Sequence, residues 1–421
     1  MKKSILLAAC FAFAASVFAQ KSQIKAAVNY LNDKNYPKAK EAIDAASIDE
    51  STKGEIRTWY IRSTVYLAMQ QDPSGEGKDF YKDAGVSLKK IIELQSDFEK
   101  TDIDKRLFAV AVYYYNDGLT AFKNNNYDKC FENFGNVVSI FNTDASKRFM
   151  GRKDFDTVAR QSALYQGYSA YYNKNYEAAL PFIEKAKNDP IVSSANTFLI
   201  LAEIYGLRKD AASQQKALAD GRKAYPQDKS LQNAEINYYI LSGKSAELVV
   251  KLEDAIRNDN NNPDLLYILG TAYNQMANPK DKDGKDLAKP TNFTELFDRA
   301  EIAFKAALSA SPDHLDANYN TGALYFNRAV GINDKMNTIT GTTAADLKKY
   351  DALKAERNEW FGKALPFLEK TIAIYDGKLG TMKPEDKDTY VNAITSAKTI
   401  YGSLNKTDKF MEMKKKQEAV K

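Results

Sequence analysis

The stretch NKNYEAALPF (Asn173–Phe182) has two close relatives elsewhere in the chain. NDKNYPKAKEAI begins at Asn32, and NNNYDKCFENF begins at Asn124. Each copy places Asn-Tyr before a run in which small or apolar residues recur at the spacing of one helix face. A pattern that recurs along a chain indicates stacked copies of one supersecondary unit, so we expect a repeat protein.

A longer pattern of small and aromatic residues surrounds the first of these stretches. Gly167 lies nine residues before Tyr176, Ala179 and Ala186 lie three and ten residues after it, and Pro190 follows. Small side chains let helix backbones approach closely, and aromatic rings fill the remaining space. The pattern resembles the tetratricopeptide repeat (TPR), in which a pair of helices, A and B, spans ~34 residues. The resemblance implies a right-handed superhelix that holds proteins together.

The same frame fits most of the chain after residue 19. The predicted fold is an all-α, right-handed superhelical solenoid of about eight to nine TPR-like helical hairpins. The predicted units lie near 22–52, 56–98, 111–144, 160–190, 195–226, 229–262, 263–312, 315–376 and 388–417.

The N-terminus, MKKSILLAACFAFAASVFAQ, has the parts of an export signal. Two lysines precede an apolar run from Ile5 to Phe18, which predicts a signal peptide over residues 1–19 and cleavage before Gln20. We therefore expect a periplasmic or secreted protein. An alternative is a lipoprotein, because Leu7–Cys10 resembles a lipobox and a lipid on Cys10 would anchor the chain. No later stretch is apolar for long enough to predict a transmembrane span.

Composition argues against several classes of function. The net charge of +5 arises from 60 basic and 55 acidic residues, which is too balanced to predict nucleic-acid binding. His314 is the single histidine and lies in a predicted turn, where a solvated or capping role is expected. Cys130 replaces a small core residue of the repeat, so it is expected to be buried. We therefore expect no enzyme activity, catalytic residue, cofactor or metal site.

Two short motifs resemble ligand loops but lack required residues. Gly243-Lys244-Ser245 has Tyr238 where a phosphate-binding loop needs glycine, so it is interpreted as a turn between helices. Asp281–Gly284 resembles part of a calcium loop, but Pro279 and Pro290 occupy two ligand positions. Neither motif predicts a bound ion or nucleotide.

Three insertions interrupt the repeat, at Gln70–Phe80, Asn278–Thr294 and Ala329–Ala355. Each is predicted to lie between helix A and helix B of its unit, so the three share one edge of the solenoid. Insertions on one edge often form a binding surface, although surface loops also tolerate changes in length. Part of Asp346–Trp360 has a helical pattern, so the third insertion is alternatively a longer helix B.

Five tyrosines occupy positions that the resemblance assigns to the inner face of the solenoid: Tyr60, Tyr115, Tyr168, Tyr267 and Tyr319. Their rings and hydroxyls suit peptides or sugars, and the alternative is packing against the preceding unit. The family's clamp for acidic C-terminal tails uses inward Lys, Asn and Arg, where this chain has mostly Tyr, Leu, Thr or Ala. The expected function is a scaffold or adaptor for another envelope protein or peptide. The alternative is a glycan- or peptide-binding module.

Overall fold

A computed structural model describes residues 22–73, 78–144, 147–378 and 382–420. Within them the regular elements are helices, and one isolated β-bridge joins Lys280 to Asp286. The predicted signal peptide, with Cys10 and Gln20, lies outside the described residues. No helix in the described part of the chain combines the length and apolarity of a transmembrane segment.

The described helices follow one another as pairs joined by turns, as the all-α prediction requires. The first helix covers residues 22–32. The others are α2 (Tyr36–Ile48), α3 (Ile56–Gln71), α4 (Phe80–Leu94), α5 (Lys100–Lys123), α6 (Tyr127–Phe141), α7 (Lys153–Tyr172), α8 (Tyr176–Ala186), α9 (Ala195–Leu207), α10 (Ala211–Ala224), α11 (Lys229–Leu241), α12 (Ser245–Asn258), α13 (Pro263–Ala277), α14 (Phe293–Ala310), α15 (Leu315–Asn337), α16 (Ala344–Asp376), α17 (Pro384–Ser403) and α18 (Thr407–Val420).

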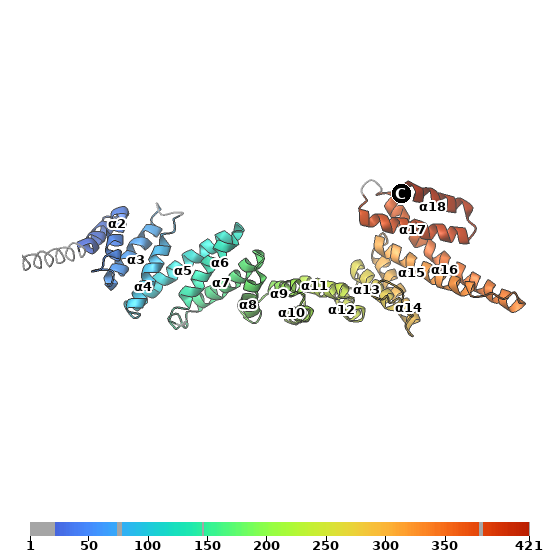
Figure 1. Cartoon of the computed structure of the whole chain (residues 1–421), viewed down its shortest axis with the longest axis horizontal. Coiled ribbons are helices and arrows are strands. Elements are labelled where there is room, and N and C mark those ends of the chain that lie inside the picture. The colour runs from blue at the N-terminus through green and yellow to red at the C-terminus, as the bar shows by residue number, and fades with distance from the viewer. Residues whose placement is uncertain (1–21, 74–77, 145–146, 379–381, 421) are drawn as a thin grey trace, which may run out of the picture. The chain divides into compact units, whose positions relative to one another are not determined.

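The chain divides into two compact units, Met1–Tyr225 and Pro226–Lys421. Inside each unit successive helices pack side by side, such as α3 with α4 and α15 with α16 (Figure 1). Odd-numbered helices correspond to helix A of the repeat and even-numbered helices to helix B. The prediction of an all-α solenoid of TPR-like hairpins is confirmed.

The recurring Asn-Tyr motif marks the turn between helix A and helix B. Asn35, Asn126 and Asn175 are the N-caps of α2, α6 and α8, and each side chain accepts a hydrogen bond from a backbone N–H of the first turn. Such caps satisfy donors that the helix itself leaves unpaired. The residue before each Asn has a positive φ, between 56° and 61°, which reverses the chain sharply. The motif therefore determines the hairpin turn.

The small residues of the repeat lie where helices A and B touch. Ala179 and Ala186 are buried, and a Cβ on Gly167 would lie 2.6 Å from Ile183 Cδ1. Gly270 has the same place in α13, where a Cβ would lie 2.5 Å from the Phe304 ring of α14. The close packing of helix B side chains against helix A therefore requires glycine at these points.

Two helices begin earlier than the predicted units at 111–144 and 160–190. α5 begins at Lys100 and α7 at Lys153, because their added turns bury apolar side chains that the repeat pattern does not include. These side chains are Ile103, Leu107 and Phe155.

Most of the third insertion is helical, so the alternative prediction of a longer helix B is confirmed, and Ala329–Ala355 does not form one long loop. α15 continues to Asn337, and α16 begins at Ala344 with a capping box formed by Thr343 and Asp346. Buried Ile332 and Met336 support the added turns of α15. The first part of α16 extends beyond the rest of the unit (Figure 1).

The close contact at Gly270 yields a stability prediction. Gly270→Ala forces a methyl group against the Phe304 ring and should lower the free energy of unfolding by about 1–3 kcal/mol. Gly362→Ala is the matched control, because Gly362 is exposed in α16 and a Cβ there meets no atom within 4 Å. The control should stabilise the protein by up to about 1 kcal/mol. Urea denaturation followed by circular dichroism measures both; equal effects would refute the packing argument.

Candidate functional site

A tyrosine hydroxyl joins helix A to the preceding helix B at five places. Each hydroxyl donates a hydrogen bond to a carboxylate, with oxygen–oxygen distances of 2.6–2.8 Å in the first four pairs. The pairs are Tyr66–Asp44, Tyr205–Glu184, Tyr273–Glu253, Tyr325–Glu301 and Tyr401–Glu369. Bonds to charged acceptors are stronger than neutral ones, so each pair locks one repeat against the next. We call them the tyrosine–carboxylate pairs.

Tyr60 is engaged by the next helix A. Its hydroxyl donates to Asp102 Oδ2 at 3.1 Å and accepts from Arg106 Nη2 at 3.0 Å. The Arg106 guanidinium lies 4.5 Å from the centre of the Tyr60 ring. Burial is the main cause that raises the pKa of Tyr60. The predicted ligand-binding ring is thus used to join α3 to α5.

Three more of the predicted tyrosines contact the following helix A. Tyr115 donates to Gln161 Oε1 at 3.1 Å, and Tyr267 accepts from Asn320 Nδ2 at 3.3 Å. Tyr319 is hydrogen-bonded to Asn392, and burial raises its pKa. These contacts favour the packing interpretation, although the partner is the following unit rather than the preceding one.

Tyr168 differs from the other four predicted tyrosines. Its ring lies 6.1 Å from that of Tyr165, and its hydroxyl has no hydrogen-bond partner among the described residues. The structure does not bring the five rings together into one ligand site.

His314 and Cys130 have structural places. His314 is the N-cap of α15, where Nδ1 accepts from the Ala317 N–H at 3.2 Å and Nε2 lies 3.1 Å from Asp264 Oδ1. Cys130 is fully buried and near Ser169, and burial raises the pKa of its thiol. No group of three or more His, Cys, Asp or Glu side chains in the described residues is arranged to hold a metal ion.

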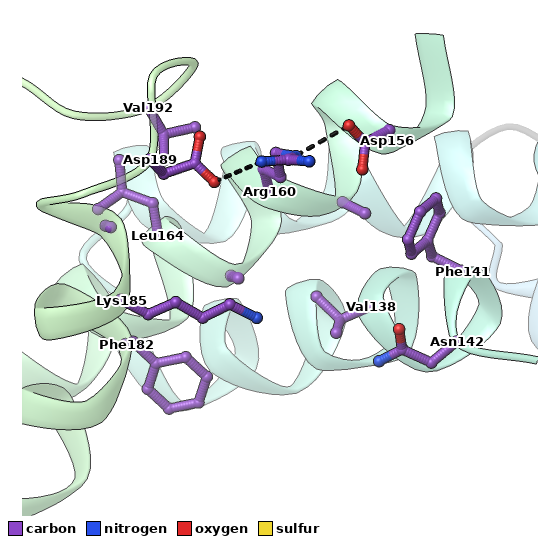
Figure 2. Close-up of a pocket in the computed structure, with 13 residues that line it drawn as sticks. Val138, Phe141, Asn142, Asp156, Arg160, Leu164, Phe182, Lys185, Asp189 and Val192 are labelled. Carbon is purple, nitrogen blue, oxygen red and sulfur yellow. Dashed lines mark hydrogen bonds and ion pairs between the residues drawn. The ribbon is translucent and has the colours of Figure 1, made fainter. Parts of the chain in front are cut away.

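A pocket of about 300 Å³ lies between α6, α7 and α8, which we call the α6–α8 pocket. Its apolar lining includes Val138, Phe141, Leu164, Phe182 and Val192. Figure 2 shows these side chains around the space, which all three helices border. The arrangement suits an apolar side chain of a bound molecule.

The charges of the α6–α8 pocket are balanced. Arg160 binds Asp156 at 2.9 Å and Asp189 at 2.8 Å, as the dashed lines in Figure 2 show. Burial opposes ionisation of Asp189, but hydrogen bonds from the Ile191 backbone and Arg160 outweigh it and hold its pKa below the usual range. Exposed Lys185 extends along the pocket between Arg160 and Phe182 (Figure 2).

A second pocket, of about 610 Å³, borders the opposite side of α6. It lies between α4, α5 and α6 and includes Val86, whose side chain is 60% exposed, together with Ile92 and Tyr114. We call it the α4–α6 pocket. Both pockets border the C-terminal half of α6, one on each side of the helix.

The second and third insertions meet at a pocket of about 290 Å³ between α13, α14 and α15, the α13–α15 pocket. The second insertion contributes Asn278, Lys289 and Phe293, and the third contributes Ile332 and Lys335. The predicted edge is therefore a real meeting place for these two insertions. Gln70–Phe80 does not line this pocket.

No protein-family model matches the chain, and no curated protein matches it. Among solved structures, it is similar to the C-terminal part of a TPR repeat-containing protein from Cytophaga hutchinsonii, with 16% identity, 73% of this chain and 95% of that chain covered, and a TM-score of 0.45. A TPR repeats protein from Bacteroides fragilis has 17% identity, coverage of 67% and 97%, and a TM-score of 0.28. YrrB, described as a TPR protein with an unusual peptide-binding site, has 15% identity, coverage of 55% and 95%, and a TM-score of 0.33.

The tyrosine–carboxylate pairs yield a prediction of pH dependence. Burial and the bond to Glu184 raise the pKa of Tyr205 to about 12 from 10.0, so the folded chain retains this proton when the unfolded chain has lost it. Stability from this pair is therefore complete below pH 10 and declines as the pH rises to about 12. Tyr205→Phe should be less stable at neutral pH and lose less stability over that window.

Tyr350→Phe is the control for this prediction. The Tyr350 side chain is 39% exposed and forms no hydrogen bond or ring contact with the described residues. Urea midpoints measured across the window should change for Tyr350→Phe as they do for the wild type. If the urea midpoint of Tyr205→Phe falls with pH as steeply as that of the wild type, the raised pKa of Tyr205 does not contribute to stability in this window.

Proposed function

We propose that the protein is a non-enzymatic scaffold or adaptor that binds another protein of the bacterial cell envelope. The observation that carries this proposal is the pair of pockets beside α6, which have apolar walls and charged rims. Two such pockets, one on each side of α6, provide places for side chains of a partner segment.

The stiffness of the array supports binding without large rearrangement. Tyr66 joins two successive hairpins that precede α6 in the chain, and Tyr205 joins two that follow it. Tyr60 and Tyr115 each join one A helix to the next. A surface held in this way loses little conformational freedom on binding, so more of the contact energy appears as affinity.

The chemistry of the rare side chains is consistent with a binding role. The single imidazole caps α15, and the thiol of Cys130 lies in the core. A glycan- or peptide-binding module that uses the five predicted tyrosines has less support, because four of the five contact a neighbouring repeat.

The envelope location is the other part of the proposal. It rests on residues 1–19, whose charged start, apolar run and small residues before Gln20 are those of an export signal. The lipid-anchored form, with Cys10 as the first residue, is the alternative.

The α6–α8 pocket yields a binding prediction. The full chain is expressed in a Gram-negative bacterium, crosslinked in intact cells and recovered with its partners. Phe182→Ala removes an apolar wall and Lys185→Glu inverts an exposed charge at the rim, so each should reduce partner capture several-fold. Mass spectrometry with isotope-labelled wild type measures the amount of partner recovered with each variant relative to the wild type.

The matched control is Ile302→Ala, because Ile302 is 67% exposed on α14 and borders none of the three pockets described above. Capture by this variant should equal that of the wild type. Thermal melts show whether each variant is folded. Unchanged capture by folded Phe182→Ala and Lys185→Glu would reject the α6–α8 pocket as the docking place.

Export predicts a particular mature N-terminus. Mass spectrometry of the protein recovered from the envelope fraction should find a chain that begins at Gln20. A chain that begins with a lipidated Cys10 would support the lipid-anchored alternative instead. An intact Met1 would refute export by this signal.

A further inference from the structure

We propose that the α13–α15 pocket binds a carboxylate side chain of the partner protein, within an acidic segment that also carries apolar residues. This inference rests on the proposed function, because it names the chemistry of the partner. The place differs from the inner-face positions of the family's clamp, since it uses the residues of two insertions.

The first observation is an arginine without an acceptor. Arg328 projects from α15, and its guanidinium forms no hydrogen bond or ion pair with the described residues. Its Nε is buried and has no partner within the described part of the chain. By contrast, Arg62 and Arg160 each bind two carboxylates. A guanidinium has five N–H donors, and leaving a buried donor unpaired is costly, so Arg328 is equipped to receive an external acceptor.

Aromatic rings hold this guanidinium in place. The Arg328 carbon Cζ lies 5.5 Å from the Phe293 ring centre, 5.7 Å from Phe297 and 5.9 Å from Trp360. Cation–π attraction positions a charge but provides no oxygen for the N–H donors. The group is therefore oriented in advance, and its hydrogen bonding is left to a ligand.

The second observation is the charge of the lining. Arg328 is joined by Lys289 and Lys335, and the described residues that line the pocket include no Asp or Glu. Lys289 lies 5.0 Å from the Phe293 ring centre and donates to Asn278. Lys335 is exposed and its ammonium has no partner among the described residues. Three cations around one space attract an anion and repel a cation.

The third observation selects the form of the anion. The pocket wall also includes Phe297, Leu324 and Ile332, so one side is apolar. A volume of about 290 Å³ admits a side chain and its neighbour rather than a large cofactor. The planar guanidinium fork matches a carboxylate in a bidentate arrangement. An acidic residue next to an apolar one satisfies both parts of the lining.

The test measures binding of a defined probe by the full chain. A fluorescein-labelled peptide of Glu and Leu is compared with a matched peptide in which every Glu is replaced by Gln, using fluorescence anisotropy. Wild type should bind the Glu peptide at least about tenfold more tightly than the Gln peptide, because the charge-assisted bonds are lost. Arg328→Gln should lose a similar factor for the Glu peptide.

Further variants keep the inference falsifiable if Arg328→Gln unfolds. Lys335→Gln changes an exposed residue and should weaken binding about threefold, with a smaller loss at high salt. Lys348→Gln is the matched control, because Lys348 is exposed in α16 and lies outside the pocket lining. It should bind as the wild type does.

Two results would overturn the inference. One is equal affinity of the wild type for both peptides. The other is that the wild type binds inorganic phosphate but not the Glu peptide, and that Lys335→Gln loses the phosphate binding. Partner capture that still depends on Phe182 and Lys185 would then leave the scaffold proposal standing.

Discussion

The hydrogen bond from a helix A tyrosine to a carboxylate on the preceding helix B is the contact on which the rest of the array depends. A hairpin cannot bury its apolar surface alone, so each one needs a neighbour in a defined register. Pairs such as Tyr273–Glu253 and Tyr325–Glu301 provide that register with a directional bond. Apolar packing is non-directional by comparison, and it fills the space that these bonds define.

Stacking in register leaves two kinds of surface free to differ. One is the side of α6, where the α6–α8 and α4–α6 pockets expose apolar walls between charged side chains. The other is the edge at the turns of α13–α14 and α15–α16, where inserted residues surround Arg328. Neither surface contributes the tyrosine–carboxylate bonds that align the hairpins. The side chains of each surface can therefore be adapted to a ligand without disturbing that alignment.

Much of the fold was predictable because it depends on local chemistry. Asn175 and Tyr176 identify the hairpin turn, Gly270 identifies a close approach of helices, and Cys130 takes a buried small-residue position. The early starts of α5 and α7 were not predictable from the repeat, since they follow burial of Phe155 and its neighbours against other helices. A search for acidic residues about 20 to 24 positions before each helix A tyrosine would have suggested four of the five tyrosine–carboxylate pairs. The fifth, Tyr401–Glu369, has a longer spacing.

By itself, the sequence determined the helices, their turns and the order of the hairpins, because caps, small residues and apolar spacing act within a few residues. The tertiary structure alone decided the use of each tyrosine and the partners of each charge. Tyr60 and Tyr267 lie against the next repeat, while Arg328 remains without a carboxylate in the described part of the chain. The physical reason is distance: partners such as Tyr60 and Arg106 are far apart in sequence and meet only when stacked helices bring them within hydrogen-bonding range.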